Sequence, residues 1–233
     1  MKFLALLISF IGAFSIVSFS QQNIKLKKKD RKRDIELVTS NGSILLRLSD
    51  STPMHRDNFL RLVKSKYYNG VLFHRVIKNF MIQSGDPESK NAPHGRALGE
   101  GGPGYTIPAE FKPSLFHKKG VLAAAREGDD VNPQKASSGS QFYIVQGKIF
   151  TDAGLDSLET LRLKRKIPSD HREIYKTVGG VPHLDQNYTV FGEVVKGIDV
   201  VDSIALVATS RQPPDRPVKD VLIINAKLVK RKK

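Results

Sequence analysis

A single arginine in an apolar stretch is the first feature of this chain that could do chemistry. Arg75 lies within residues 73–86, a run of aromatic and aliphatic side chains, and Gln83 follows eight positions later. An arginine is charged at every physiological pH and offers several N–H donors in a planar fork. Such a group can stabilise a transition state that accepts a hydrogen bond, without any covalent intermediate.

Other kinds of chemistry find little support in the composition. The chain has no cysteine, which excludes disulfides, thiolate metal sites and a cysteine nucleophile. The histidines also lack the spacing of metal ligands. We therefore predict no metal site and no cofactor. The histidines in question are His55, His74, His94, His117 and His171.

Three sequence blocks, taken in order, resemble the cyclophilin family of peptidyl-prolyl cis-trans isomerases. They read FHRVIKNFMIQSGD at 73–86, AAAR at 123–126 and SGSQFYIV at 138–145. The family motif is FHRxIxxFMxQxGD, followed by an SQF-aromatic strand. The resemblance implies an enzyme that rotates X–Pro peptide bonds without a cofactor. Its substrates would be unfolded or extended polypeptides that contain proline.

The resemblance also implies roles for individual residues. Arg75 matches the catalytic arginine, and Gln83 matches the glutamine that orients this arginine and the substrate backbone. The substrate-binding positions that it implies are Phe80, Met81, Ala125, Arg126, Gln141, Tyr143, His183, Leu184 and Tyr188. Core packing is the ordinary role of several of these residue types, and only their joint match favours a pocket.

Three positions depart from the family pattern. Tyr143 stands where a phenylalanine is usual, and its added hydroxyl needs a polar partner. His183 occupies a position often held by tryptophan, and Tyr188 one often held by histidine. None of these changes removes the arginine or the apolar pocket.

The elements that must position these residues are mainly strands. Apolar residues alternate on both sides of Asn41-Gly42, which predicts a hairpin. A helix is predicted from Pro53 to Gly70, with Asp50, Ser51 or Thr52 as its cap. Further strands are expected at 71–77, 80–84, 120–125, 141–145, 188–195 and 221–229, and a second helix from 198 to about 207. This pattern predicts a closed eight-stranded antiparallel β-barrel capped by two helices.

Residues 147–182 form a longer connection than a compact cyclophilin has. Leucines recur among charged residues from Asp152 to Arg165, and Ser169-Asp170 could begin another helix. We predict an inserted helical hairpin, which could be surface decoration or an element that contacts substrates. Gly179-Gly180 would permit it to move.

The first twenty residues have the layout of a secretory signal peptide. Lys2 precedes an apolar run that extends to Phe19, and Ser18 and Ser20 provide small residues for cleavage near Ser20. An uncleaved membrane anchor is the alternative, because the run approaches the length that spans a bilayer. Either way the sequence predicts export, to the periplasm or the cell envelope.

The positive charge is concentrated near the two ends. The formal net charge is +15, and lysines and arginines cluster at 25–33 and 227–233. We expect a basic linker at 21–33, an isomerase domain at 34–230 and a basic tail at 231–233. The arms are expected to be solvated, with weak contact to an anionic membrane surface. They contain no aromatic residues to stack on bases, so no specific nucleic-acid binding is predicted, and we expect a monomer.

Two functions remain after these observations. One is a prolyl isomerase that assists the folding of exported proteins. The other is a catalytically weak chaperone or scaffold that binds proline-containing peptides. Arg75 favours the enzyme, because simple binding of such peptides does not require this arginine.

Overall fold

The computed structural model describes residues 24–231 of the chain. The predicted signal peptide and its cleavage site therefore lie outside the described residues, as do the last two residues of the tail. Within residues 24–231, no helix combines the length and the apolar character needed to cross a membrane.

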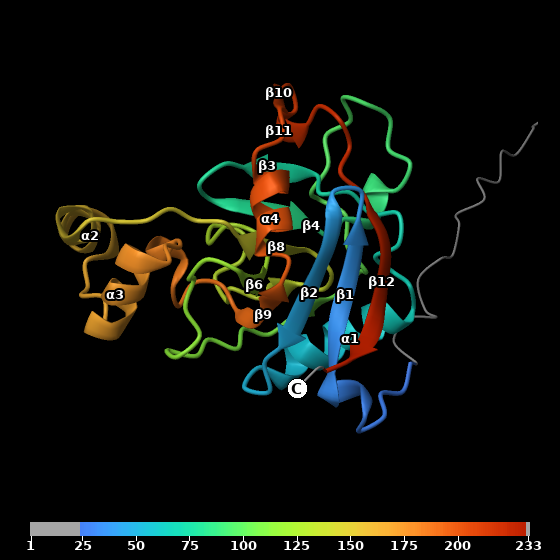
Figure 1. Cartoon of the computed structure of the whole chain (residues 1–233), viewed down its shortest axis with the longest axis horizontal. Helices are drawn as coiled ribbons and strands as arrows, with labels where there is room; N and C mark the ends of the chain where they lie inside the picture. Colours follow the sequence, from blue (N-terminus) through green and yellow to red (C-terminus); the bar gives the residue numbers. More distant parts are fainter. Residues whose placement is uncertain (1–23, 232–233) are drawn as a thin grey trace, which may run out of the picture.

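A mainly antiparallel β architecture organises the described chain (Figure 1). Within residues 24–231, eight strands form one sheet in the order β12-β1-β2-β9-β6-β8-β4-β3. These strands are β1 (Arg33–Thr39), β2 (Gly42–Leu48), β3 (Arg75–Ile77), β4 (Met81–Ser84), β6 (Val121–Ala124), β8 (Phe142–Val145), β9 (Val190–Lys196) and β12 (Ile223–Lys230). Two small ribbons pair β5 (Thr106–Ile107) with β7 (Ser137–Ser138), and β10 (Thr209–Arg211) with β11 (Pro214–Pro217).

The predicted hairpin joins β1 to β2. Ile35 pairs with Leu46 and Leu37 with Ile44, so the alternating apolar residues of both strands share one face. Gly42 follows the turn with a φ of 131°, and a Cβ atom there would lie 2.8 Å from Val200 Cγ2. Both the backbone angle and the close approach of Val200 favour glycine at this position.

The expectation of a closed barrel is wrong, because β3 and β12 are the edges of the sheet and form no ladder with each other. β3 has 3 residues and forms a ladder with β4 alone. The chain just before β3 approaches the other edge instead. Gly70 N–H donates to the Ile223 carbonyl at 2.8 Å, and Phe73 N–H donates to the Val221 carbonyl at 2.8 Å.

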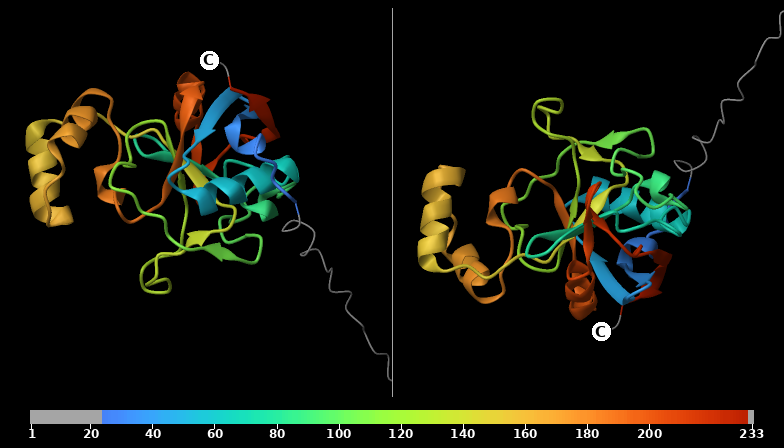
Figure 2. Two further views of the ribbon diagram at one scale, coloured as in Figure 1. Left: turned by 90° about the horizontal axis from the view of Figure 1, so that it is seen from below. Right: turned by 90° about the horizontal axis from the view of Figure 1, so that it is seen from above.

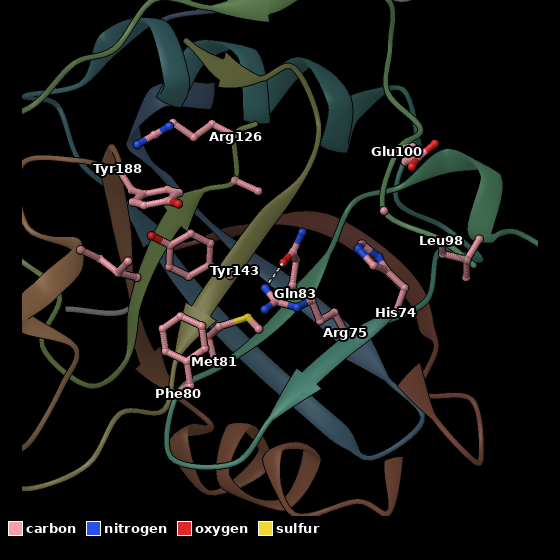
Figure 3. A pocket seen from close by; sticks show the side chains of 13 residues that line it. His74, Arg75, Phe80, Met81, Gln83, Leu98, Glu100, Arg126, Tyr143 and Tyr188 are labelled. Atoms are coloured by element: carbon pink, nitrogen blue, oxygen red, sulfur yellow. Dashed lines mark hydrogen bonds between the residues drawn. The ribbon is translucent and has the colours of Figure 1, made fainter. Parts of the chain in front are cut away.

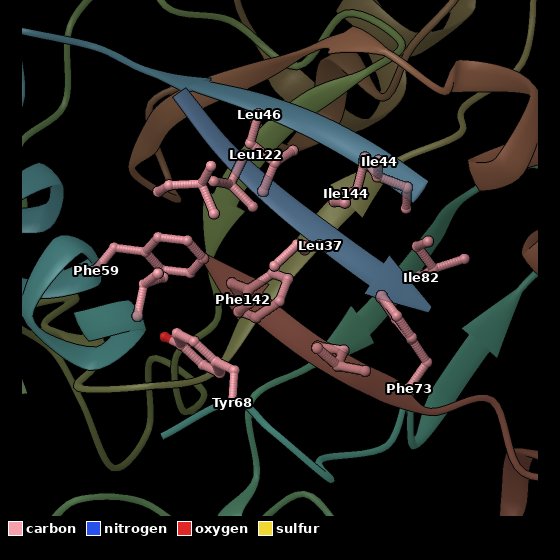
Figure 4. Packing of buried hydrophobic residues seen from close by; sticks show 14 of the residues in the cluster. Leu37, Ile44, Leu46, Phe59, Tyr68, Phe73, Ile82, Leu122, Phe142 and Ile144 are labelled. Carbon is pink, nitrogen blue, oxygen red and sulfur yellow. The ribbon is translucent and has the colours of Figure 1, made fainter. Parts of the chain in front are cut away.

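The sheet separates two apolar layers, because successive side chains of a strand point to opposite faces. In β8, Phe142 and Ile144 join the main core, whereas Tyr143 and Val145 join a second cluster on the other face. Figure 4 shows the main core, where the rings of Phe59, Tyr68 and Phe142 lie against one another. The ring of Phe142 makes edge-to-face contacts with the other two, at centroid distances of 5.3 and 5.4 Å.

Two helices pack on this core (Figure 1). Helix α1 (Pro53–Lys64) lies against β12 and β9, and α4 (Ile198–Ala205) lies against β2, β3 and β4. The predicted caps of α1 make no side-chain cap hydrogen bond. Glu110 replaces them, since its carboxylate accepts from the backbone N–H groups of Met54 at 3.2 Å and His55 at 3.0 Å. The helix also ends at Lys64, earlier than predicted, because Lys66 turns the chain with a φ of 58°.

The segment between β8 and β9 contains α2 (Asp152–Leu158), the π-helix η3 (Glu159–Leu163) and α3 (Ser169–Thr177). Figures 1 and 2 show α2 and α3 standing beside the sheet rather than over its core. A third apolar cluster, with Leu155 and Tyr175 fully buried, holds them together. We refer to residues 147–182 as the helical segment.

Gly179 and Gly180 are fixed rather than free to move. Lys119 N–H donates to the Gly179 carbonyl at 2.9 Å, and Gly180 N–H donates to the Lys148 carbonyl at 3.0 Å. A Cβ atom at Gly180 would collide with the His117 carbonyl oxygen and lie 2.6 Å from the Tyr175 ring. Glycine therefore permits close packing here and does not act as a hinge.

The described part of the basic linker is folded against the domain, which corrects the expectation of a solvated arm. Leu26 packs against the main core, and Asp30 accepts a hydrogen bond from Lys64 Nζ at 2.8 Å. Arg31 donates to both carboxylate oxygens of Asp57, from Nε to Oδ1 at 3.0 Å and from Nη2 to Oδ2 at 2.7 Å. Several lysines of this stretch nevertheless remain exposed.

Buried His74 should make stability depend on pH. Burial lowers the pKa of His74 from 6.5 to about 4. Stability from this group is present above the unfolded pKa and is lost as pH falls toward the folded pKa. We expect a loss of about 2 kcal/mol between pH 7 and pH 5. Urea unfolding of the wild type and of His74→Gln at both pH values measures this difference.

His74→Gln should lose less stability than the wild type over the same pH interval, since glutamine does not titrate. Other titrating groups are common to both proteins, so their contributions cancel in the comparison. Equal pH dependence of the two proteins would contradict the assignment to His74.

Candidate functional site

The antiparallel register places the predicted site residues in one row across the sheet. Arg75 of β3 pairs with Gln83 of β4, Gln83 pairs with Tyr143 of β8, and Tyr143 pairs with Ala123 of β6. Directly opposed residues point to the same face. The strands therefore bring the arginine, the glutamine and the tyrosine together on the face away from the main core.

A tight turn between β3 and β4 positions Phe80. Asn79 adopts a left-handed conformation with a φ of 62°, and Phe80 N–H donates to the Ile77 carbonyl at 3.1 Å. Gln146 fixes this turn, because its Oε1 accepts from Asn79 N–H at 2.6 Å. The ring of Phe80 lies beside Met81 and Tyr143 in the pocket (Figure 3).

A line of amide hydrogen bonds orients the arginine. Arg75 Nη1 donates to Gln83 Oε1 at 3.3 Å, which is marked in Figure 3. Arginine can only donate, so Oε1 is the acceptor and the Gln83 amide nitrogen donates to Gln141 Oε1 at 3.1 Å. Gln141 Nε2 in turn donates to the carbonyls of Gly99 at 2.7 Å and Gly101 at 2.8 Å. The loop 99–101 thus fixes the direction of every bond in the line.

A carboxylate approaches the other side of the same guanidinium. Asp215 Oδ2 lies 3.5 Å from Arg75 Nε, and both side chains are partly exposed. Asp215 belongs to β11, whose next residue, Arg216, is buried and donates to the Pro93 and Arg96 carbonyls at 3.0 and 2.7 Å. Arg75 is therefore held from two sides by groups far apart in the sequence.

Beside the arginine lies a cavity of about 290 Å³ whose walls are apolar on one side and polar on the other. Met81, Tyr143 and Leu184 belong to the second apolar cluster, and Phe80 and Tyr188 pack against it. The cavity is lined by His74, Arg75, Phe80, Met81, Gln83, Leu98, Gly99, Glu100, Ala125, Arg126, Tyr143, Leu184 and Tyr188.

Most of the predicted site residues line this cavity, but Gln141 and His183 do not. Gln141 lies beneath loop 99–101 and acts on Gln83. His183 stacks on Phe80 with ring centroids 5.8 Å apart. Burial lowers the pKa of His183 from 6.5 to about 4, and the positive charges of Arg162 and Lys148 add to the effect, while Asp185 opposes it. The imidazole that stacks on Phe80 is therefore neutral at pH 7.

Arg126 lines the cavity, but its guanidinium is engaged within the protein. Nε donates to the Asn187 carbonyl at 2.8 Å, and Nη2 pairs with Asp129 at 2.6 Å. The guanidinium carbon also lies 4.5 Å from the centroid of the Tyr188 ring. Arg126 thus supports the wall formed by Tyr188, and direct binding of substrate by its charge stays a prediction.

Sequence reasoning missed several residues of the site. His74, Leu98 and Glu100 line the cavity, and Asp215 contacts the arginine. No local pattern could have found Asp215, because a separate ribbon brings it to β3. His117 was missed as well, although the Tyr143 hydroxyl required a buried partner. Among residues 24–231, no cluster of three or more His, Cys, Asp or Glu side chains could hold a metal ion.

The sequence of this chain is similar to proteins of a known family. A family model described as cyclophilin type peptidyl-prolyl cis-trans isomerase/CLD matches residues 34–228. A Staphylococcus saprophyticus protein is 33% identical over 218 residues, which cover 92% of this chain and 100% of the relative. A Staphylococcus epidermidis protein is 36% identical over 205 residues, which cover 85% of this chain and 94% of the relative. Both carry the words peptidyl-prolyl cis-trans isomerase in their names.

Solved structures show the same mainly β fold. A crystal structure of a Cryptosporidium parvum cyclophilin type peptidyl-prolyl cis-trans isomerase has a TM-score of 0.63 and 21% sequence identity, and the match covers 86% of this chain and 99% of that one. A second crystal structure of that protein, in the presence of the dipeptide Ala-Pro, has a TM-score of 0.61 and 21% sequence identity, with 84% and 98% covered.

The lowered pKa of His183 can be measured directly. We expect its ring Cε1–H resonance to shift with a midpoint near pH 4, because burial disfavours the charged imidazole. Proton NMR titration of the wild type, with His183→Phe to assign the resonance, tests this expectation. A midpoint near 6.5 would show that the ring is solvated and not held against Phe80.

Proposed function

Because this chain belongs to the cyclophilin family and is a peptidyl-prolyl cis-trans isomerase, we propose that Arg75 is its catalytic group and Gln83 the residue that orients it. The observation that carries this assignment is the placement of Arg75 in the cavity, beside the apolar walls formed by Phe80, Met81 and Tyr143. Nη1 is held by Gln83 and Nε lies near Asp215, so Nη2 remains available for a substrate.

The reaction requires only that the twisted amide be favoured over the planar one. Rotation about an X–Pro bond has a barrier of about 18–20 kcal/mol, because the planar amide is stabilised by resonance. In the twisted state the proline nitrogen regains a lone pair and can accept a hydrogen bond. A guanidinium N–H at that point stabilises the transition state more than either planar isomer, which is the condition for catalysis.

Each part of the site has a task in this mechanism. The walls formed by Phe80, Met81, Tyr143 and Leu184 hold the proline ring by apolar contact. The Gln141–Gln83–Arg75 line keeps the guanidinium in one orientation, so that little reorganisation is needed during rotation. Ala125 lines the adjoining part of the cavity, where an extended peptide could lie beside β6.

We propose that the substrates are unfolded or extended polypeptides that contain proline. The open cavity beside Arg75 and the dipeptide Ala-Pro in the related crystal structure support this class. The pattern of residues 1–20 supports export to the periplasm or cell envelope, where the protein would assist folding as a monomer. The helical segment is proposed to be an insertion relative to compact members of the family.

We also propose a weak contact with anionic membrane surfaces through the exposed lysines near the start of the described chain. Lys27, Lys28 and Lys29 are exposed, and the ion pairs formed within residues 24–231 do not include them. Arg31 is committed to Asp57, so these lysines and not the whole linker would face the membrane.

Replacing Arg75 by alanine should lower kcat/KM for a proline-containing tetrapeptide by at least about tenfold. The loss of a transition-state hydrogen bond from a charged donor costs about 1.5–3 kcal/mol. Arg31→Ala is the matched control, because Arg31 is also a partly exposed arginine in an ion pair but does not line the cavity. Equal activities of the two variants would remove Arg75 from the mechanism.

Reversing two of the exposed charges, Lys28→Glu with Lys29→Glu, should weaken binding to vesicles that contain anionic lipid. Tetrapeptide isomerisation should stay unchanged. Exposed charges are screened beyond about 8–10 Å at moderate salt, so wild-type binding should fall steeply with ionic strength. Vesicle sedimentation at several salt concentrations measures it, and binding that is indifferent to salt or to the reversal would refute the contact.

A further inference from the structure

A continuous line of buried hydrogen bonds connects the helical segment to a wall of the active-site cavity. It begins at Tyr175 of α3, whose hydroxyl donates to Asp185 Oδ2 at 2.7 Å. The other oxygen, Asp185 Oδ1, lies 2.9 Å from His117 Nδ1. His117 Nε2 lies 2.9 Å from the hydroxyl of Tyr143. We call Tyr175, Asp185, His117 and Tyr143 the buried polar chain.

All four members are shielded from water. Tyr175 and His117 are 0% exposed, and Asp185 and Tyr143 are 4% exposed. A buried polar group that loses its partner incurs the full cost of desolvation, so each contact here constrains its neighbours strongly. A change at one end of the chain should therefore be felt at the other.

The direction of each bond follows from what the groups can donate. Burial raises the pKa of both tyrosines, so their hydroxyls keep their protons. Asp185 accepts from Tyr175 and also from the backbone N–H of His117 at 2.8 Å. A carboxylate can only accept, so Nδ1–H of His117 donates to Asp185, and in that tautomer Nε2 accepts from the Tyr143 hydroxyl. The tautomer that donates to Asp185 is thus the one that can accept a hydrogen bond from the Tyr143 hydroxyl.

His117 also supports a second wall of the cavity through its backbone. The His117 carbonyl accepts from Val181 N–H at 2.8 Å, and the short helix η4 (Pro182–Leu184) follows directly and carries Leu184. The preceding residue, Phe116, packs in the apolar cluster of the helical segment. Its ring stacks on that of His171, with the ring centroids 3.7 Å apart. Phe116 thus packs in the helical segment, and the next residue, His117, contacts Tyr143 behind the cavity wall.

We propose that Tyr175, Asp185 and His117 are positioning residues for prolyl isomerisation, which set the orientation of the Tyr143 ring. The helical segment is then part of the active site through these bonds, although its helices do not line the cavity. Tyr143 contacts the proline ring whether the X–Pro bond is planar or twisted. Loss of the buried polar chain therefore weakens substrate binding in both states. Such a loss raises KM and leaves kcat nearly unchanged.

This inference rests on the proposed role of Tyr143 as a wall of the proline pocket, and the experiment separates the two. Tyr175→Phe removes one hydroxyl from the far end of the chain and keeps the ring that packs in the helical segment. Arg75→Ala should impair turnover whether or not the buried polar chain orients Tyr143. If Arg75→Ala has no effect, the proposed function fails. If only Tyr175→Phe has no effect, the positioning role fails.

The experiment measures tetrapeptide isomerisation by the wild type, Tyr175→Phe, Tyr143→Phe and the double variant. The matched control is Ile167→Val, which trims a buried side chain in the same apolar cluster without touching the polar chain. We expect Tyr175→Phe to raise KM by about three- to tenfold, the equivalent of one net hydrogen bond. Ile167→Val should leave KM unaltered. Mere loss of folded protein would lower the apparent kcat and not raise KM.

Two further readouts decide the outcome. In the double variant, Tyr175→Phe should have less effect than in the wild type, because Tyr143→Phe already disconnects the wall from the chain. The ¹⁵N resonance of His117 Nε2 should also move in Tyr175→Phe. An unchanged KM, additive effects in the double variant, or a KM increase equal to that of Ile167→Val would overturn the proposal.

Discussion

The pairing of β3, β4 and β8 is the constraint on which the rest of this molecule depends. Because opposed residues share a face, this register alone brings Arg75, Gln83 and Tyr143 into contact range of one cavity. The same alternation sends Val76, Ile82 and Ile144 into the main core. A slip of one residue in β4 would exchange the two sets, burying polar groups and exposing apolar ones. Fold stability and the site are therefore secured by the same hydrogen bonds.

The strands fix the position of the Arg75 backbone, and contacts from loops fix the orientation of its guanidinium. Gln141 holds loop 99–101 and, through Gln83, turns the guanidinium, while Asp215 approaches from a ribbon near the end of the described chain. Each of these contacts is modest by itself, and the one with Asp215 is partly exposed, where an ion pair contributes little. Their joint effect is directional, since a planar guanidinium with fixed partners on two edges retains little rotational freedom.

Sequence reasoning reached the strands, the main helices and most cavity residues, because alternation and a contiguous motif are local signals. It failed where distant segments decide the outcome. Glu110 caps α1 in place of Thr52, and Leu26 and Arg31 fold a basic stretch that composition alone assigns to solvent. Sequence reasoning also could not decide whether the barrel closes, because closure depends on how the two edge strands β3 and β12, which are distant in sequence, lie relative to each other. The sequence predicts that the Tyr143 hydroxyl has a polar partner, but only the structure identifies this partner as His117.

The hydroxyl of Tyr143 has a consequence for how this family can diverge. A phenylalanine at this position needs no polar neighbour, whereas the tyrosine is satisfied here only through His117, whose other nitrogen engages Asp185 and, through it, α3. A chain without the helical segment would lack Tyr175, and with it the hydroxyl that engages Asp185. In such a chain phenylalanine would suit the wall better than tyrosine, because it needs no buried polar partner, so the residue that fits at 143 depends on a helix that it does not touch.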